Sequence, residues 1–124
     1  FAFTGGPATM ELMRAGKLHI LATTGPRRFT VTPEIPTIAE SGLPGYDLVG
    51  WVALFATGGT PPEVVAKLNA ETVRGLAQAD ARKRIEDTGA EAATGTPQEL
   101  AAFVAREIDK YGKLIRVANI RPEQ

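Results

Sequence analysis

The chain has 124 residues, enough for one domain with a hydrophobic core, and its 44% hydrophobic content is that of a globular protein rather than a disordered one. Fourteen Lys and Arg balance fourteen Asp and Glu, so the net charge offers no attraction for nucleic acid or an anionic membrane. The absence of cysteine excludes disulfides, thiolate metal sites and cysteine nucleophiles, and no apolar run reaches the roughly 18 residues of a membrane span.

The first 24 residues predict a strand, a helix and a second strand. Residues 1–4 have the apolar character of a buried strand, which Gly and Pro then interrupt. Residues 7–15 contain good helix formers, and Gly16 follows as a C-terminal cap. Residues 18–24 are short, apolar and rich in β-branched side chains, as strands are. This order is typical of a parallel α/β unit.

The middle of the chain predicts a loop followed by a long strand. Pro and Gly interrupt residues 25–45 every few positions, although residues 37–41 can form one helical turn. Residues 46–56 are the longest apolar run, and they hold Trp51, the only tryptophan. Gly50 within that run indicates a bend or a close approach of another backbone.

Two related tetrapeptides predict helix starts. Residues 60–63 read TPPE and residues 96–99 read TPQE. In both, Thr can cap the unpaired N–H groups, Pro suits the first helical position, and Glu can complete a capping box. Between these helices we expect Asp80 to cap a short helix that Gly89 ends, and residues 90–93 to form a short edge strand.

No constellation of catalytic or metal-binding residues is evident. His19 is the only histidine, and without a Ser or Asp spaced to partner it we interpret it as structural. The turn at residues 58–61 precedes a helix and could hold an anion, but it lacks the complete phosphate-binding and dinucleotide motifs. The sequence therefore favours a protein that is not an enzyme, and it indicates no cofactor and no metal.

The loop at residues 4–9 is the candidate binding segment. It joins the end of a predicted strand to a helix start, and ligands sit at this edge of open parallel sheets. Two Thr hydroxyls and the N–H groups of the helix start suit a carboxylate. A tight turn with a capping threonine explains the same residues, and a position in the core explains Trp51 better than a ligand contact does. The candidate ligand contacts are Thr4, Gly5, Gly6, Ala8 and Trp51.

Five blocks of sequence, in fixed order and spacing, carry a family resemblance. They are AGKLHILATTGPRR (15–28), EIPTIAESGLPGY (34–46), WVALFATGGTP (51–61), VVAKLNAE (64–71) and GAEAATGTPQELAAF (89–103). Together they resemble the tripartite tricarboxylate transporter substrate-binding proteins, the TctC or Bug family. The most specific part is PTIAESGLPGY followed by WxxLFA.

The resemblance implies a periplasmic or otherwise extracytoplasmic receptor. Such receptors have two lobes that close over a small carboxylate, and they deliver it to two membrane components of the transporter. The implied fold class is α/β, a partial type II periplasmic-binding-protein-like architecture of parallel-sheet units with flanking helices. This chain resembles the C-terminal part only, so residues 1–47 correspond to the end of the second lobe. Residues 48–124 correspond to the crossover strand and the C-terminal portion of the first lobe.

The expected function is that of a solute-binding protein fragment that binds a small carboxylate or dicarboxylate. Family members often have Asp-Asn-Leu-Pro where this chain has Thr4 to Pro7, so a carboxylate and an amide are missing from that loop. The family's N-terminal Pro- and Gly-rich loop is also absent, so we expect the isolated chain to bind such ligands weakly or not at all. The alternative is a non-binding structural or oligomerising α/β module. A fragment of a receptor and a naturally short chain both fit, and a fragment would expose apolar faces that favour self-association.

Overall fold

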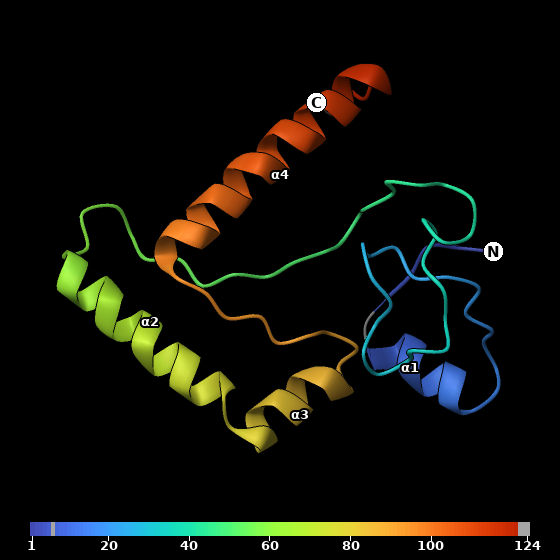
Figure 1. Ribbon diagram of the computed structural model, residues 1–124, viewed down its shortest axis with the longest axis horizontal. Coiled ribbons are helices and arrows are strands. Elements are labelled where there is room, and N and C mark those ends of the chain that lie inside the picture. The colour runs from blue at the N-terminus through green and yellow to red at the C-terminus, as the bar shows by residue number, and fades with distance from the viewer. Residues whose placement is uncertain (6, 122–124) are drawn as a thin grey trace.

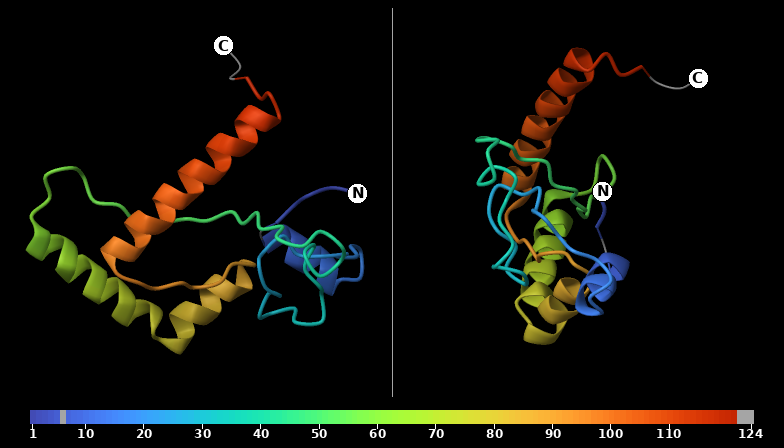
Figure 2. Two further views of the ribbon diagram at one scale, coloured as in Figure 1. Left: turned by 45° about the horizontal axis from the view of Figure 1, so that its top comes forward. Right: turned by 90° about the vertical axis from the view of Figure 1, so that its right-hand side faces the viewer.

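The computed structural model describes residues 1–5 and 7–121, and within these it contains four helices (Figure 1). They are α1 (Pro7–Arg14), α2 (Pro62–Leu76), α3 (Ala79–Asp87) and α4 (Pro97–Val117). α1 and the loops around it form one part of the molecule, and α2, α3 and α4 form the other. One extended segment, residues 48–57, joins the two parts, and a second, residues 90–96, returns from the end of α3 to the start of α4, as Figures 1 and 2 both show.

α4 begins where the sequence predicts. The Thr96 hydroxyl accepts a hydrogen bond from the Glu99 backbone N–H at 3.1 Å, and the Glu99 carboxylate accepts one from the Thr96 backbone N–H at 2.7 Å. This capping box satisfies two backbone donors at the start of the helix. The predicted capping box of the TPQE sequence is therefore confirmed.

The capping box predicted at the start of α2 is wrong. The N-cap residue is Pro61, and no side chain caps the helix. The second proline of TPPE moves the helix start by one residue, so Glu63 stands one position too early to bond back to the cap. The Thr60 hydroxyl instead donates to the Thr57 carbonyl oxygen at 2.8 Å, within the preceding turn.

The other helix ends agree with the sequence except at Asp80. Gly16 follows α1 with φ +67° and Gly89 follows α3 with φ +80°, the left-handed conformation that glycine adopts without strain. α3 begins after Gln78 with no side-chain cap, so the prediction that Asp80 caps it is wrong. Asp80 lies in the first turn of α3 and forms an ion pair with Arg84 at 3.0 Å.

The strands predicted at residues 1–4, 18–24, 46–56 and 90–93 are not formed within the described part of the chain. Its β-structure is one parallel bridge between Thr23 and Thr37. There the Thr23 N–H donates to the Pro36 carbonyl oxygen and the Ile38 N–H donates to the Thr23 carbonyl oxygen, both at 2.9 Å. The Leu48 N–H donates to the Thr24 carbonyl oxygen at 3.0 Å. Of the expected parallel-sheet units, only this bridge is formed in the described chain. A strand needs a neighbouring strand to accept its hydrogen bonds, and the other predicted strands lack one.

The hydrophobic core is small and lies beside α1. Among the side chains that the structure describes, Met10 and Ile35 are the buried apolar ones, and α2 and α3 have no buried residue. The accessible surface is 9720 Å². A compact monomer of this mass exposes about 6,400 Å². The chain therefore leaves much apolar surface in contact with water.

The Glu91 carboxylate ties residues 27–30 to the segment that follows α3. It accepts hydrogen bonds from the two terminal nitrogens of Arg27 at 3.2 and 2.5 Å, and from the backbone N–H and hydroxyl of Thr30 at 3.0 and 2.9 Å. Partial burial opposes ionisation of Glu91, but the bonds from Thr30 and Arg27 outweigh it and hold the pKa of this carboxyl below its ordinary 4.5.

Replacing Glu91→Ala removes the acceptor of all these hydrogen bonds. We expect the free energy of unfolding to fall by about 1–2 kcal/mol, a modest value because Arg27 stays hydrated. Urea titration followed by circular dichroism measures the loss. Glu34→Ala, at an exposed carboxylate with no hydrogen bond in the described structure, is the matched control and should change stability by less than about 0.5 kcal/mol. Equal losses in both variants would contradict the role of Glu91.

The contribution of Glu91 should depend on pH. Since its folded pKa lies below its unfolded value, its stabilisation is complete above the unfolded pKa and is lost as pH falls through the folded pKa. The stability difference between the natural chain and Glu91→Gln should therefore stay constant near neutral pH and shrink below 4.5. Urea midpoints measured at a series of pH values test this. A difference that persists unchanged into strong acid would show that the charge of Glu91 is not responsible.

Candidate functional site

A hollow of about 400 Å³ lies where the N-terminal residues, the loop before the extended segment, and α4 meet. Its lining combines hydroxyl groups with apolar surface. Phe3 and Leu48 supply apolar side chains, and Gly50 adds open backbone. The hydroxyl-bearing lining residues are Thr4, Thr24, Tyr46 and Tyr111. Such a surface suits a small ligand with an apolar body and polar ends.

Thr4 connects this hollow to the start of α1. Its hydroxyl lies 3.3 Å from the hydroxyl of Thr9, which belongs to the first turn of the helix. No acidic side chain occupies the first turn of α1, so none neutralises the positive end of the helix dipole there. The side of the hollow that Thr4 forms is therefore next to the start of α1, where negative charge is favoured.

A network of charges on α4 adjoins the hollow. The Lys110 ammonium lies 2.6 Å from the Glu107 carboxylate, 3.9 Å from that of Asp47, and 5.5 Å from the centre of the Tyr111 ring. The hydrogen bond to the buried Glu107 carboxylate is the main cause that raises the pKa of Lys110, and Asp47 adds to it. With two carboxylates beside it, Lys110 fixes α4 against the loop rather than offering free positive charge to a ligand.

The predicted site residues are only partly brought together. Thr4 lines the hollow, whereas Gly6 lies outside the described residues. Gly5 is exposed, with open space where a side chain would stand, and Ala8 is exposed in α1. Trp51 lies on the extended segment, where its ring meets that of Phe103 of α4 edge-on, with centroids 5.3 Å apart. Trp51 thus contacts α4, and its neighbour Gly50 lines the hollow instead.

Sequence reasoning missed Thr24, Tyr46 and Tyr111 as lining residues. Thr24 could have been predicted as a lining residue, because it ends a predicted strand just as Thr4 does. The ends of parallel strands lie at the same edge of a sheet. Tyr46 began a predicted strand. Tyr111 recurs with Val104 and Ile108 at helical spacing, a pattern typical of the apolar face of a helix.

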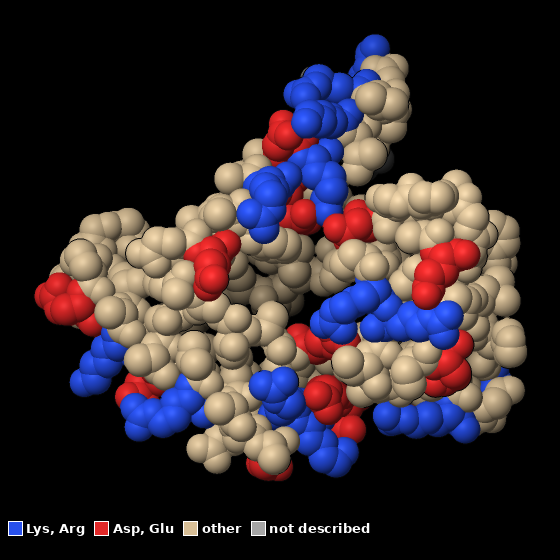
Figure 3. Space-filling view, in the orientation of Figure 1, with Lys and Arg blue, Asp and Glu red and all other residues tan. Residues whose placement is uncertain are grey.

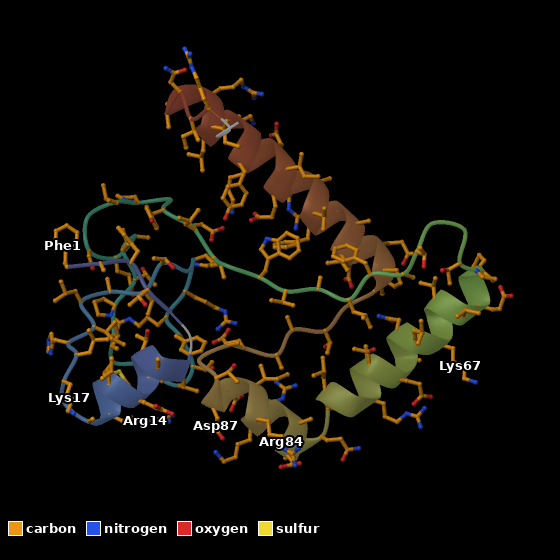
Figure 4. The ribbon with its side chains drawn as sticks, turned by 180° about the vertical axis from the view of Figure 1, so that it is seen from behind. Phe1, Arg14, Lys17, Lys67, Arg84 and Asp87 are labelled. Carbon is orange, nitrogen blue, oxygen red and sulfur yellow. The ribbon has the colours of Figure 1, made fainter. Side chains whose placement is uncertain are left out.

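A second hollow, of about 470 Å³, lies at the end of α1 and includes His19, Lys17 and Glu34. Figure 4 shows Lys17 and Arg14 at the outer end of that helix. His19 is exposed rather than part of a buried strand. Within residues 1–5 and 7–121, no group of three His, Cys, Asp or Glu could hold a metal ion. None of the helices there has the length and apolar character needed to cross a membrane.

Comparison with known proteins identifies the family. The family model of the tripartite tricarboxylate transporter family receptors, TctC, matches residues 2–120. The chain belongs to the TctC family. A UPF0065 protein from the tcbD-tcbE intergenic region of a Pseudomonas species is 38% identical over 102 residues, which are 82% of this chain and 30% of that protein.

Two solved structures extend the likeness to the fold. R. palustris Rpa4515 with adipate has a TM-score of 0.80 at 35% identity, covering 94% of this chain and 39% of that one. The periplasmic binding protein BugD has a TM-score of 0.78 at 30% identity, covering 93% of this chain and 39% of that one. The chain spans about a third of the length of the Pseudomonas protein and of BugT from Bordetella pertussis.

Family membership confirms several predictions. TctC proteins are extracytoplasmic receptors rather than enzymes, as the resemblance implied. The solved neighbours confirm a periplasmic-binding-protein-like fold. The division into lobes at residue 47 and the ligand contacts of Thr4, Gly5, Gly6, Ala8 and Trp51 stay predictions.

The contact between Trp51 and Phe103 can be tested by fluorescence. Phe103→Ala removes the ring that packs against Trp51, the only tryptophan. We expect the emission of Trp51 to shift to longer wavelength and its quenching by acrylamide to increase, because the indole gains water. Phe55→Ala, on the same segment but exposed, is the control and should change neither signal. Unchanged emission in Phe103→Ala would contradict the contact.

Proposed function

We propose that this chain is the solute-binding part of a tripartite tricarboxylate-type transporter receptor and that its ligand is a small carboxylate or dicarboxylate. The match of residues 2–120 to the receptor family carries this proposal. The solved neighbour with adipate, a dicarboxylate, supports the ligand class. The proposed ligand site is the hollow that includes Thr4, Thr24 and Tyr111.

The chemistry of the hollow supports a carboxylate held by neutral donors. Its volume falls within the range of small-molecule sites. Hydroxyls of Thr and Tyr can donate to carboxylate oxygens, and the start of α1 favours negative charge beside Thr4. The apolar chain of a dicarboxylate would lie against Phe3 and Leu48. Lys110 takes no direct part, because Glu107 and Asp47 already pair with it.

In the proposed mechanism two parts of the chain approach each other around the ligand. The first part is residues 1–47, and the second is residues 48–124. The hollow takes lining residues from both, Thr4 and Thr24 from the first and Tyr111 from the second, so their approach would tighten it. The loaded receptor then delivers its ligand to the membrane components of the transporter, in the extracytoplasmic space.

A structural or oligomerising module is the second candidate. The many exposed large apolar side chains favour it, since large exposed apolar surfaces mark association sites. Such a module would bind itself and no carboxylate. The two candidates therefore differ both in oligomeric state and in their response to a dicarboxylate.

Adipate should bind the isolated chain weakly, on the order of millimolar, at the hollow. In a nitrogen-15 NMR titration we expect shifts at Thr4, Thr24 and Tyr111, because these residues line the site. Thr4→Val removes a hydroxyl donor and should weaken binding about three- to tenfold. Thr94→Val, at an exposed position away from the hollow, is the matched control.

The neutral analogue 1,6-hexanediol separates carboxylate binding from apolar contact. It has the same chain length as adipate and no charge, so it should cause no comparable shifts. Equal shifts with hexanediol, or none with adipate, would overturn the carboxylate proposal. Micromolar affinity would overturn the expectation that the isolated chain binds weakly.

A further inference from the structure

Asp47 stands between two residues that line the hollow, Tyr46 and Leu48. The backbone on both sides of Asp47 is held in place. The Tyr46 N–H donates to the Leu43 carbonyl oxygen at 3.1 Å. The Leu48 N–H donates to the Thr24 carbonyl oxygen at 3.0 Å. Any interaction of the Asp47 side chain therefore acts on this side of the hollow, here called the loop wall (residues 46–48).

Lys110 stands beside Tyr111, the residue of α4 that lines the hollow. Its ammonium lies 5.5 Å from the centre of the Tyr111 ring, within the range of a cation–π contact. It also lies 2.6 Å from the carboxylate of Glu107, whose side chain is only 10% exposed. Because a buried carboxylate needs a paired cation, Lys110 is held close to α4. The position of its charge is thereby tied to the side of the hollow that Tyr111 forms.

The ion pair between Lys110 and Asp47 joins these two sides of the hollow. The ammonium and the Asp47 carboxylate are 3.9 Å apart, and both side chains are partly exposed. Figure 3 shows basic side chains gathered along α4, with acidic ones among them. Among the described residues, the other ion pairs of α4 lie within the helix, as that of Lys113 with Asp109 does. The pair with Asp47 is therefore the one that connects α4 to a different segment.

We propose that Lys110 is a positioning residue for the ligand site, and that its ion pair with Asp47 holds the loop wall near Tyr111. The inference rests on the proposed function, because it assigns a role at the proposed carboxylate site. Lys110 does not line the hollow, and two carboxylates already pair with it, so it acts through the walls rather than through a bond to the ligand. A partly exposed pair at this distance is weak, so the two sides can separate and approach again.

The separation of the two sides can be measured without a ligand. The chain has no cysteine, so Arg106→Cys carries a nitroxide spin label at a single place. Arg106 is exposed on α4, one turn before Lys110 on the same face, and the label should broaden the amide signals of residues 46–48. Asp47→Asn removes the charge but keeps the shape of the side chain and the pair between Lys110 and Glu107. We therefore expect this variant to fold and the broadening to decrease.

The affinity for adipate, measured by the nitrogen-15 NMR titration, is the second readout. Asp47→Asn and Lys110→Met should each weaken adipate binding about two- to fivefold, the size expected of a partly exposed ion pair. Lys110→Arg keeps the positive charge and should restore most of the affinity that Lys110→Met loses. Lys113→Met is the matched control, since it removes an exposed ion pair that lies within α4. It should change neither the affinity nor the broadening.

Unchanged broadening in Asp47→Asn overturns the inference even where adipate binds the natural chain, and this variant decides the matter if Lys110→Met does not fold. Reduced broadening with unchanged adipate affinity also overturns it, because the two sides would then move without effect on the site. Equal losses in Lys113→Met would show a general effect of charge on α4 and overturn it as well. If the natural chain binds no adipate while Asp47→Asn still reduces the broadening, the solute-binding proposal fails and the ion pair retains its role in holding the two sides together.

Discussion

The bridge between Thr23 and Thr37 is the one point in the described chain where two extended segments satisfy each other's backbone groups. Leu48 bonds to Thr24 at its side, so three segments meet there. The buried side chains Ile35 and Thr32 lie in one of these segments or just before it. Away from this point the chain has helices, which satisfy their own backbone, and extended segments, which do not. The regular secondary structure of the described chain is therefore helical apart from this bridge.

Helices were predictable because their signals are local. Thr96 and Glu99 stand three residues apart, and Gly16 and Gly89 end helices through their own backbone freedom. The wrong capping prediction at Thr60 depended on a single additional proline, which moved the start of α2 by one residue. Strands were predicted from the pattern of side chains. Such a pattern indicates which face of a strand is apolar, but it does not indicate which other strand would pair with it. The predictions at residues 46–56 and 90–93 therefore describe extended backbone rather than sheet.

A residue of the candidate site could be predicted only where the sequence directly around it indicates its position. Thr4 was found because it ends an apolar run before a helix, and the structure puts it in the hollow. Tyr111 comes from more than a hundred positions along the chain, and no spacing rule connects it with Thr4. The Glu107 and Lys110 pair is visible at helical spacing, but its second carboxylate, Asp47, comes from a distant loop. Non-local contact therefore sets the limit of prediction for the site, as for the sheet.

The extended segment at residues 48–56 also links the fold to ligand affinity. Leu48 and Gly50 belong to it and line the hollow, so any contact that fixes residues 48–56 also fixes one wall of the proposed site. The apparent affinity of a site falls in proportion to the fraction of molecules in the binding-competent state. If fixing this segment raises that fraction from about one in a hundred to nearly all, the affinity for a carboxylate rises about a hundredfold with no new contact to the ligand. Weak binding of a carboxylate by residues 1–124 would then be a consequence of the unpaired backbone of residues 49–56.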